Sequence, residues 1–217
     1  MDQIGKNELP GLFRRLSQTF AEQRTFLIEL DGKVGDSDLG ITMNKGFNAA
    51  LDAVAANTTD KIGKTLQLAG MAIAKAAPST MGTLTATGFM RGGKAIGEAS
   101  AIGTAEMAAF WTAYRDGVEE RGKAKVGNKT LLDVLHPIAL SLQESTAAGV
   151  ALSEAMEAAA QAAAAGLEAT KTMVAQHGKA ACFPEKSLGL QDAGATVGVL
   201  IINTLRAFVA EDKGVTP

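Results

Sequence analysis

Three aspartates lie close together in the segment DGKVGDSDLG, and their spacing points to metal chemistry. Asp31, Asp36 and Asp38 fall within eight residues, on a turn that its glycines make pliable. Two carboxylates about 4 Å apart repel each other by about 4 kcal/mol when the effective dielectric constant is roughly 20. A bound cation removes this repulsion. Mg²⁺ is a natural candidate because it takes a few carboxylates and completes its shell with phosphate oxygens and water.

The same residue types also suit a solvated turn that holds no metal. Aspartate and glycine are favoured in tight turns, and an aspartate often caps the helix that follows. A calcium-binding EF-hand is disfavoured, since the twelfth position counted from Asp36 is Phe47 instead of the glutamate that such a loop requires. The residues of this segment alone leave the metal site and the solvated turn open.

Two glycine-rich segments resemble phosphate-binding P-loops without matching one. Residues 88–94, GFMRGGK, have suitable spacing, but Ala95 replaces the metal-binding Ser or Thr and no strand leads in. We expect these glycines to serve close helix packing. Residues 122–130, GKAKVGNKT, carry an extra Asn, yet they open a predicted helix, where backbone N–H groups favour anions. His136 and His177 are too few and too isolated for a zinc site.

The hydrophobic periodicity predicts an all-α chain. Apolar residues make up 47% of the sequence but aromatic residues only 5%, and the abundant alanine favours helices. No strand ladder is evident. The eight predicted helices start and end near residues 8–30, 40–54, 61–77, 82–97, 104–121, 131 onward, 152–174 and 195–210. An irregular stretch, residues 177–194, precedes the last of them.

Short connections between successive helices predict an antiparallel eight-helix bundle or closed barrel. Four loops, at residues 31–40, 78–82, 122–130 and 178–194, are about two helices apart, so an up-and-down path gathers them at one end. This gathering would turn scattered motifs into one site at one end of the barrel. No linker or shift in composition divides the chain, and we expect residues 1–217 to form a single domain.

The bulk composition excludes several function classes. A formal net charge of −2 argues against a dedicated nucleic-acid binder. One cysteine, Cys182, excludes an internal disulfide framework and suits a reducing compartment. The first residues lack a secretory signal, and no apolar run approaches the roughly 20 residues needed to span a bilayer. We therefore expect a cytoplasmic protein with no membrane span.

The acidic turn, PSTMG at 78–82, GNKT at 127–130 and LGLQDAGAT at 188–196 occur in this order along the chain. Read together, they make the sequence resemble the L, nucleotide-binding subunit (DhaL type, DAK2 domain) of dihydroxyacetone kinases, over essentially its whole length. The resemblance implies an eight-helix barrel with ADP or ATP bound at one end. It also implies two Mg²⁺ ions, held by Asp31, Asp36 and Asp38, with no catalytic residue certain beyond these aspartates.

The resemblance also implies a set of nucleotide-binding residues. Near the phosphates these would be Leu39, Gly40, Ile41 and Thr42, at the start of a helix, with Thr80 and Met81 contacting the nucleotide from the next loop. Gly122 and Leu131 would line the side of the base, and Asp192, Ala193 and Gly194 would close over the base or ribose. Lys179 would stand at a nucleotide-binding position that is usually an arginine.

Several residues depart from the pattern of the resembled family. Leu39 stands where a histidine is common, and Leu190 where a second histidine is found. Lys179 replaces an arginine, and Ala193 replaces a proline. The aspartates survive, so nucleotide binding is still expected, but the substrate and the phosphoryl donor become uncertain.

The resemblance implies a kinase that works only with a partner. The chain would pass a phosphoryl group to a small ketose, dihydroxyacetone or a similar sugar, held by a separate K-type subunit. The donor is either exchanging ATP or a tightly held ADP that a phosphocarrier protein recharges. An ATP-dependent ketotetrose kinase subunit, a nucleotide-loaded regulatory or interaction module and a plain helical scaffold are the alternatives, and a homodimer stays open.

Overall fold

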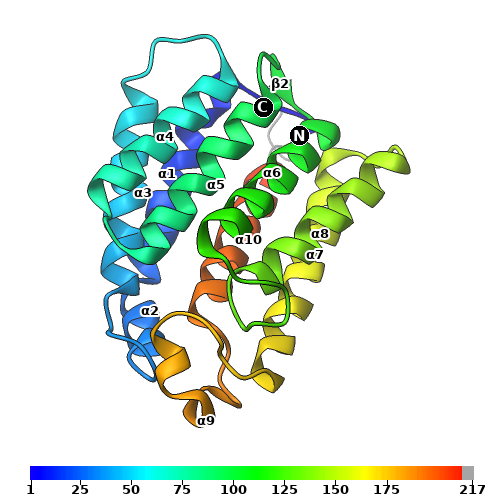
Figure 1. The fold of residues 1–217 in the computed structure, drawn as a ribbon. Helices are drawn as coiled ribbons and strands as arrows, with labels where there is room; N and C mark the ends of the chain where they lie inside the picture. Colours follow the sequence, from blue (N-terminus) through cyan, green and yellow to red (C-terminus); the bar gives the residue numbers. More distant parts are fainter. Residues whose placement is uncertain (212–217) are drawn as a thin grey trace.

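The computed structural model describes residues 1–211, and eight long helices dominate it (Figure 1). These are α1 (Leu9–Glu22), α3 (Leu39–Ala55), α4 (Ile62–Ala76), α5 (Thr80–Ile96), α6 (Thr104–Gly122), α7 (Leu132–Ala147), α8 (Leu152–Ala169) and α10 (Ala193–Glu211). The shorter elements are β1 (Ile4–Gly5), β2 (Ala101–Ile102), α2 (Arg24–Asp31), α9 (Pro184–Ser187) and three 3₁₀ turns, Lys6–Glu8, Thr170–Thr172 and Lys179–Cys182.

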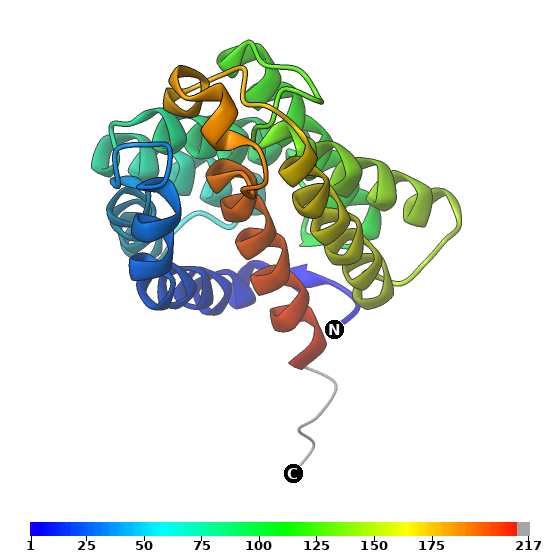
Figure 2. The ribbon, with the colours of Figure 1, turned by 90° about the horizontal axis from the view of Figure 1, so that it is seen from below.

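The long helices form a closed antiparallel ring. Each packs on its neighbours in chain order, and α10 closes the ring by packing against both α8 and α1. Seen from below, Figure 2 shows α10 between these two helices. The predicted all-α, eight-helix antiparallel barrel is confirmed. The N-terminus and the C-terminal end of α10 lie away from α2 and α9, at the opposite end of the ring (Figure 1).

Apolar faces of the helices meet in one continuous core, which holds the ring together. Phe20 of α1 stacks on Phe47 of α3 with ring centroids 4.4 Å apart. The glycines of α5 allow close approach: a Cβ on Gly88 would lie 2.2 Å from the Tyr114 ring. A Cβ on Gly93 would lie 2.6 Å from the carbonyl oxygen of Gly63. Residues 88–94 are therefore a packing surface, as predicted.

Two helix boundaries and one pair of strands differ from the sequence prediction. The first predicted helix, residues 8–30, is split at Gln23 into α1 and α2. The seventh ends at Ala169 instead of continuing to residue 174, because a 3₁₀ turn follows it. A small antiparallel pair, β1 with β2, was not predicted, and strands of two residues are too short to show alternation.

α10 corrects the expectation that no apolar run approaches membrane-spanning length. Its residues, Ala193–Glu211, are long and apolar enough to cross a bilayer by length and composition. Half of that window is buried within the protein, where α10 packs against α8, α1 and α7. A core helix of a barrel meets the same criteria, so the finding is weak evidence for a membrane span.

Candidate functional site

The four predicted loops meet at one end of the barrel and line a cavity of about 470 Å³. Its wall combines the acidic turn, the start of α5, the loop before α7 and the segment before α10. This is the end at which α2 and α9 lie in Figure 1. The predicted gathering of the loops is thus observed, and it follows from the up-and-down path of the helices.

The acidic turn brings its three carboxylates together on the cavity wall. Asp31 ends α2 and Asp38 precedes α3, and each of Asp31, Asp36 and Asp38 has a carboxylate oxygen within 4.8 Å of the others. Ser37 adopts a left-handed backbone conformation, with φ of 61°, and the N–H of Asp38 donates to Asp31 Oδ2 at 3.1 Å. Non-glycine residues are rarely left-handed, and such strain is common at functional sites.

Gly35 is required at its position in this turn. A Cβ there would lie 2.2 Å from Asp31 Oδ1 and 2.7 Å from the Asp31 carbonyl oxygen. Any side chain would push the Asp31 carboxylate away from the other two. The glycine therefore allows three acidic groups to share one centre, and hard divalent cations prefer such oxygen ligands.

Lys179 forms an ion pair with Asp36, across the opening of the cavity. The two side chains are 64% and 39% exposed, so water screens the pair and it contributes little to stability. The contact nevertheless places a cation against one of the three carboxylates. It brings the segment before α10 over the acidic turn.

Four helices begin at the cavity and direct their N-termini toward it. The N-terminal residues Leu39 of α3, Thr80 of α5, Leu132 of α7 and Ala193 of α10 all line it. The side chain of Asp38 makes no capping hydrogen bond to α3. Free first-turn N–H groups and helix dipoles favour anions, phosphates in particular.

Comparison with known proteins identifies the family. The DAK2 domain model matches residues 33–207. The chain belongs to the DAK2 domain family. It is 31% identical over 209 residues, 96% of the chain and 99% of the relative, to the Escherichia coli protein named PEP-dependent dihydroxyacetone kinase, ADP-binding subunit DhaL. The resemblance to DhaL-type subunits is thereby confirmed.

Some other relatives are longer proteins, which this chain matches over part of their length. L-erythrulose kinase of Pectobacterium atrosepticum is 33% identical over 87% of this chain, which spans only 32% of that protein. Two crystal structures of the dihydroxyacetone kinase of C. freundii, one native and one with AMP-PNP and Mg²⁺, share the fold with TM-scores of 0.73 and 0.71. They are 20% and 23% identical to this chain. The matches cover 95% and 91% of this chain but only 36% and 33% of the crystallised chains.

Most of the predicted nucleotide-binding residues of this DAK2 domain lie on the cavity wall. The nine that line it are Leu39, Thr80, Met81, Gly122, Leu131, Lys179, Asp192, Ala193 and Gly194. Leu190, at the second position where the family has a histidine, also lines it. Both histidine replacements therefore fall on the site itself.

Three predicted residues of α3 lie away from the cavity wall. Gly40 packs against α2, where a Cβ would lie 2.1 Å from the carbonyl oxygen of Arg24. The side chain of Ile41 is exposed and that of Thr42 is buried. Contact with a nucleotide by the side chains of these residues receives no support from the structure. The N–H of Thr42 donates to the carbonyl oxygen of Asp38 at 2.9 Å, so only the backbone N–H groups of Gly40 and Ile41 can serve phosphates.

Sequence reasoning missed an apolar wall and a histidine. The wall includes Leu30, Leu84, Val118 and Ala124, which come from helices and loops far apart in the chain. Apolar side chains of this kind provide a surface against which a planar base can pack. His177 also lines the cavity, although its isolation in the sequence gave no indication of a role there. None of these residues belongs to a motif, so only the packed barrel reveals them.

The GNKT segment is not a P-loop. Lys129 is buried at the cavity wall, and its ammonium donates to backbone carbonyls of residues 170–190 instead of being left free for a phosphate. Asp133 orders the loop instead: its carboxylate accepts the N–H of Gly127 at 2.5 Å and that of Thr130 at 2.7 Å. These buried bonds fix the loop before α7 as part of the cavity wall.

Asp192 has an unusual titration, which gives a testable pH dependence. Burial raises the pKa of Asp192 to about 6, although its carboxylate accepts the N–H of Ala195 and lies near the Lys129 charge. The folded chain therefore binds more protons than the unfolded chain between about pH 4 and pH 6. In this window the free energy of unfolding falls as the pH rises, by about 2 kcal/mol after allowance for partial exposure of the residue.

We expect Asp192→Asn to remove this contribution. The asparagine still caps α10, so at pH 4 the variant and the original chain should have similar free energies of unfolding. At pH 7 the variant should be the more stable of the two. Urea unfolding at both pH values measures the difference, and an equal difference at the two pH values would contradict the assignment.

Proposed function

We propose that this DAK2 domain binds a Mg²⁺-nucleotide and supplies its terminal phosphoryl group to a small ketose held by a partner subunit. The observation that carries the proposal is the cavity itself. It joins three clustered carboxylates, four helix N-termini and an apolar wall. These three features suit, respectively, divalent cations, a polyphosphate and a base.

The carboxylates of Asp31, Asp36 and Asp38 fit Mg²⁺, because they offer hard oxygen ligands within reach of one centre. When bound, Mg²⁺ would neutralise the negative charge that develops on the phosphates in phosphoryl transfer. The protein's own task is positioning. The N–H groups at the start of α3 orient the phosphates, and the apolar wall holds the base. Residues 177–180 exclude water from the outer side.

Residues 1–217 are proposed to act as one nucleotide-binding domain, of which residues 212–217 lie outside the described part. A continuous core and a family match over residues 33–207 support this proposal. The E. coli relative is named a subunit, so a second, K-type subunit that carries the ketose is part of the proposal. Dihydroxyacetone and ketotetroses are the proposed substrates, since relatives are named dihydroxyacetone and erythrulose kinases. Such a kinase subunit would work in the cytoplasm.

The donor is tested by mass spectrometry of the gently purified chain. Retained ADP would favour recharging by a phosphocarrier protein, as the name PEP-dependent suggests for the E. coli relative. An empty chain would favour exchange with free ATP.

Reconstitution tests the function as a whole. The chain is mixed with a K-type subunit, Mg²⁺, ATP or a phosphocarrier system, and either dihydroxyacetone or erythrulose. Sugar phosphate should form only when both subunits are present. A chain that binds Mg²⁺-nucleotide but supports no turnover under any of these conditions would instead be the regulatory module.

A further inference from the structure

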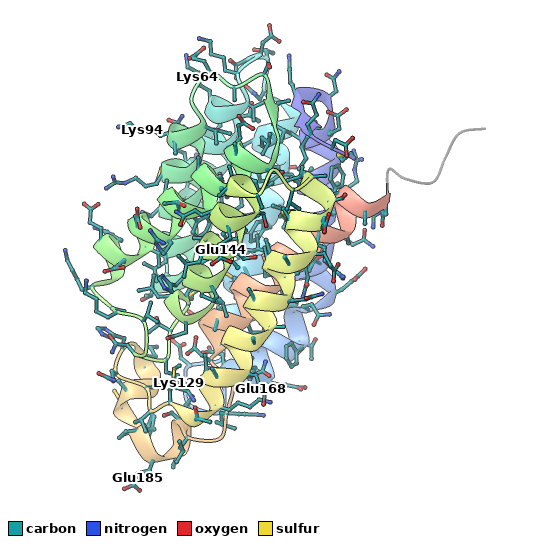
Figure 3. The ribbon with its side chains drawn as sticks, turned by 90° about the vertical axis from the view of Figure 1, so that its right-hand side faces the viewer. Lys64, Lys94, Lys129, Glu144, Glu168 and Glu185 are labelled. Atoms are coloured by element: carbon teal, nitrogen blue, oxygen red, sulfur yellow. The ribbon has the colours of Figure 1, made fainter. Side chains whose placement is uncertain are left out.

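Lys129 is buried in a way that is rare for lysine. Lys129 is only 2% exposed, and its backbone adopts a left-handed conformation, with φ of 58°. Figure 3 shows Lys129 at the end of the barrel where the segment with α9 packs, whereas Lys64 and Lys94 lie toward the other end. Burying a cation and holding a lysine in this conformation both cost free energy. Simple packing does not require either.

The ammonium of Lys129 donates to four backbone carbonyls. The Nζ–O distances are 2.8 Å to Thr170, 3.2 Å to Met173, 2.6 Å to Ser187 and 2.6 Å to Leu190. An ammonium has three N–H groups, so four acceptors use its full capacity. Burial lowers the pKa of Lys129, and the charge of Asp192 opposes this shift.

These carbonyls lie at or next to the two ends of one loop segment, residues 173–190, which we call the flap. We call its two ends, with the residues next to them, the stems. Thr170 and Met173 lie where the flap begins, and Ser187 and Leu190 lie where it returns. The stems are also tied to each other, since the N–H of Ala175 donates to Ser187 Oγ at 3.0 Å. Lys129 is the one side chain among the described residues that donates hydrogen bonds to both stems.

The tip of the flap covers the cavity. His177, Gly178, Lys179 and Ala180 line it. Next to the tip, the N–H of Gln176 donates to the carbonyl oxygen of Asn128 at 3.2 Å, and the tip itself is tied to the barrel through the surface ion pair of Lys179 with Asp36. A screened pair of this kind is weak. The position of the tip is therefore set mainly at the stems.

We propose that Lys129 is a positioning residue for the nucleotide, because its ammonium fixes both stems of the flap and so holds the tip over the bound ligand. This inference rests on the proposed function. The ammonium of Lys129 is committed to these carbonyls, although Lys129 also lines the cavity. Its effect is to slow the release of the nucleotide, since the flap must lift before the ligand leaves.

The test compares Lys129→Met with Lys125→Met. Methionine keeps much of the length of lysine but donates no hydrogen bond, whereas Lys125 is an exposed lysine of the same loop that pairs with Glu119. Stopped-flow binding of fluorescent ADP with Mg²⁺ should show dissociation about 10-fold faster for Lys129→Met, with an unchanged association rate. Lys125→Met should match the original chain. A general loss of folding would lower the bound fraction without changing the dissociation rate.

Hydrogen exchange without ligand provides the independent readout. Lys129→Met should exchange faster at residues 173–190 and not in α4 or α5. Ser187→Ala, which loosens the same stems while keeping Lys129, serves if the first variant fails to fold, and it should also speed dissociation. Unchanged flap exchange or an unchanged dissociation rate in the folded variants would overturn the proposal. An original chain that binds no Mg²⁺-ADP would refute the proposed function. The exchange data would still test whether Lys129 fixes the stems of the flap.

Discussion

Asp36→Asn should weaken Mg²⁺-ADP binding by about 100-fold, or about 2.7 kcal/mol, while leaving the fold intact. Asparagine keeps the shape of the side chain but removes one of the three charges that share a centre. Asp36 is exposed and pairs only with the exposed Lys179, so the free energy of unfolding should change by less than about 0.5 kcal/mol. Removing a like charge from the cluster offsets part of the lost ion pair.

Isothermal titration calorimetry with Mg²⁺-ADP measures this effect, and circular dichroism measures helicity. Asp52→Asn is the matched control, because Asp52 is an exposed aspartate of α3 outside the cluster. It removes the same charge from the helix that follows the acidic turn and should bind normally. Undiminished affinity in Asp36→Asn would show that this carboxylate does not hold the metal.

Gly40→Ala should lower the free energy of unfolding by about 3 kcal/mol, the upper part of the range for overpacking. The added Cβ would lie 2.1 Å from the carbonyl oxygen of Arg24 and 3.0 Å from its carbon. Both are backbone atoms, which cannot rotate away, so α3 must move off α2. Asp31 ends α2 and Asp38 precedes α3. The same movement should separate these carboxylates and weaken Mg²⁺-ADP binding.

Gly46→Ala is the control for this substitution. Its nearest neighbour would be Ile73 Cγ2 at 3.3 Å, a side-chain methyl group instead of a backbone atom, and alanine favours the helix. Gly46→Ala should therefore change stability much less. Urea unfolding and calorimetry of both variants decide the matter. Equal stabilities would contradict the close approach of α2 and α3 at Gly40.

The ring of helices could be predicted because each helix carries its own periodic signal. Seven of the eight predicted helices correspond to single elements, and the loops between alternate helices meet at one end as an antiparallel path demands. The split at Gln23 carries no such signal: no proline or glycine marks it, and the apolar spacing continues across it. Packing of α2 against α3 shapes that break, and packing is not visible in local sequence.

The acidic turn could be found from its residues, but the remainder of the wall could not. Lys129 looked like part of a phosphate loop, and the structure uses it to hold carbonyls of distant residues. Gly40 looked like a phosphate neighbour, and the structure uses it for helix contact. In both cases the residue type suits two roles. The choice depends on partners more than ten residues away in sequence.

Leu39 and Leu190 give this cavity a less polar wall than the family pattern of histidines would provide. A leucine can neither donate a hydrogen bond nor carry charge. The proposed binding therefore depends on the aspartates with their metal, on Lys179 and on backbone N–H groups. We therefore expect nucleotide binding to require the metal.

Calorimetry of ADP binding with and without Mg²⁺ tests the central proposal most directly. Without a divalent ion, the phosphates meet three carboxylates, of which only Asp36 is paired with a cation among the described residues, and we expect no measurable binding. With Mg²⁺ at millimolar concentration, binding should appear and saturate at one nucleotide per chain. Equal affinity for ADP in Mg²⁺ and in EDTA would contradict the proposal that the aspartates of the acidic turn act through a metal.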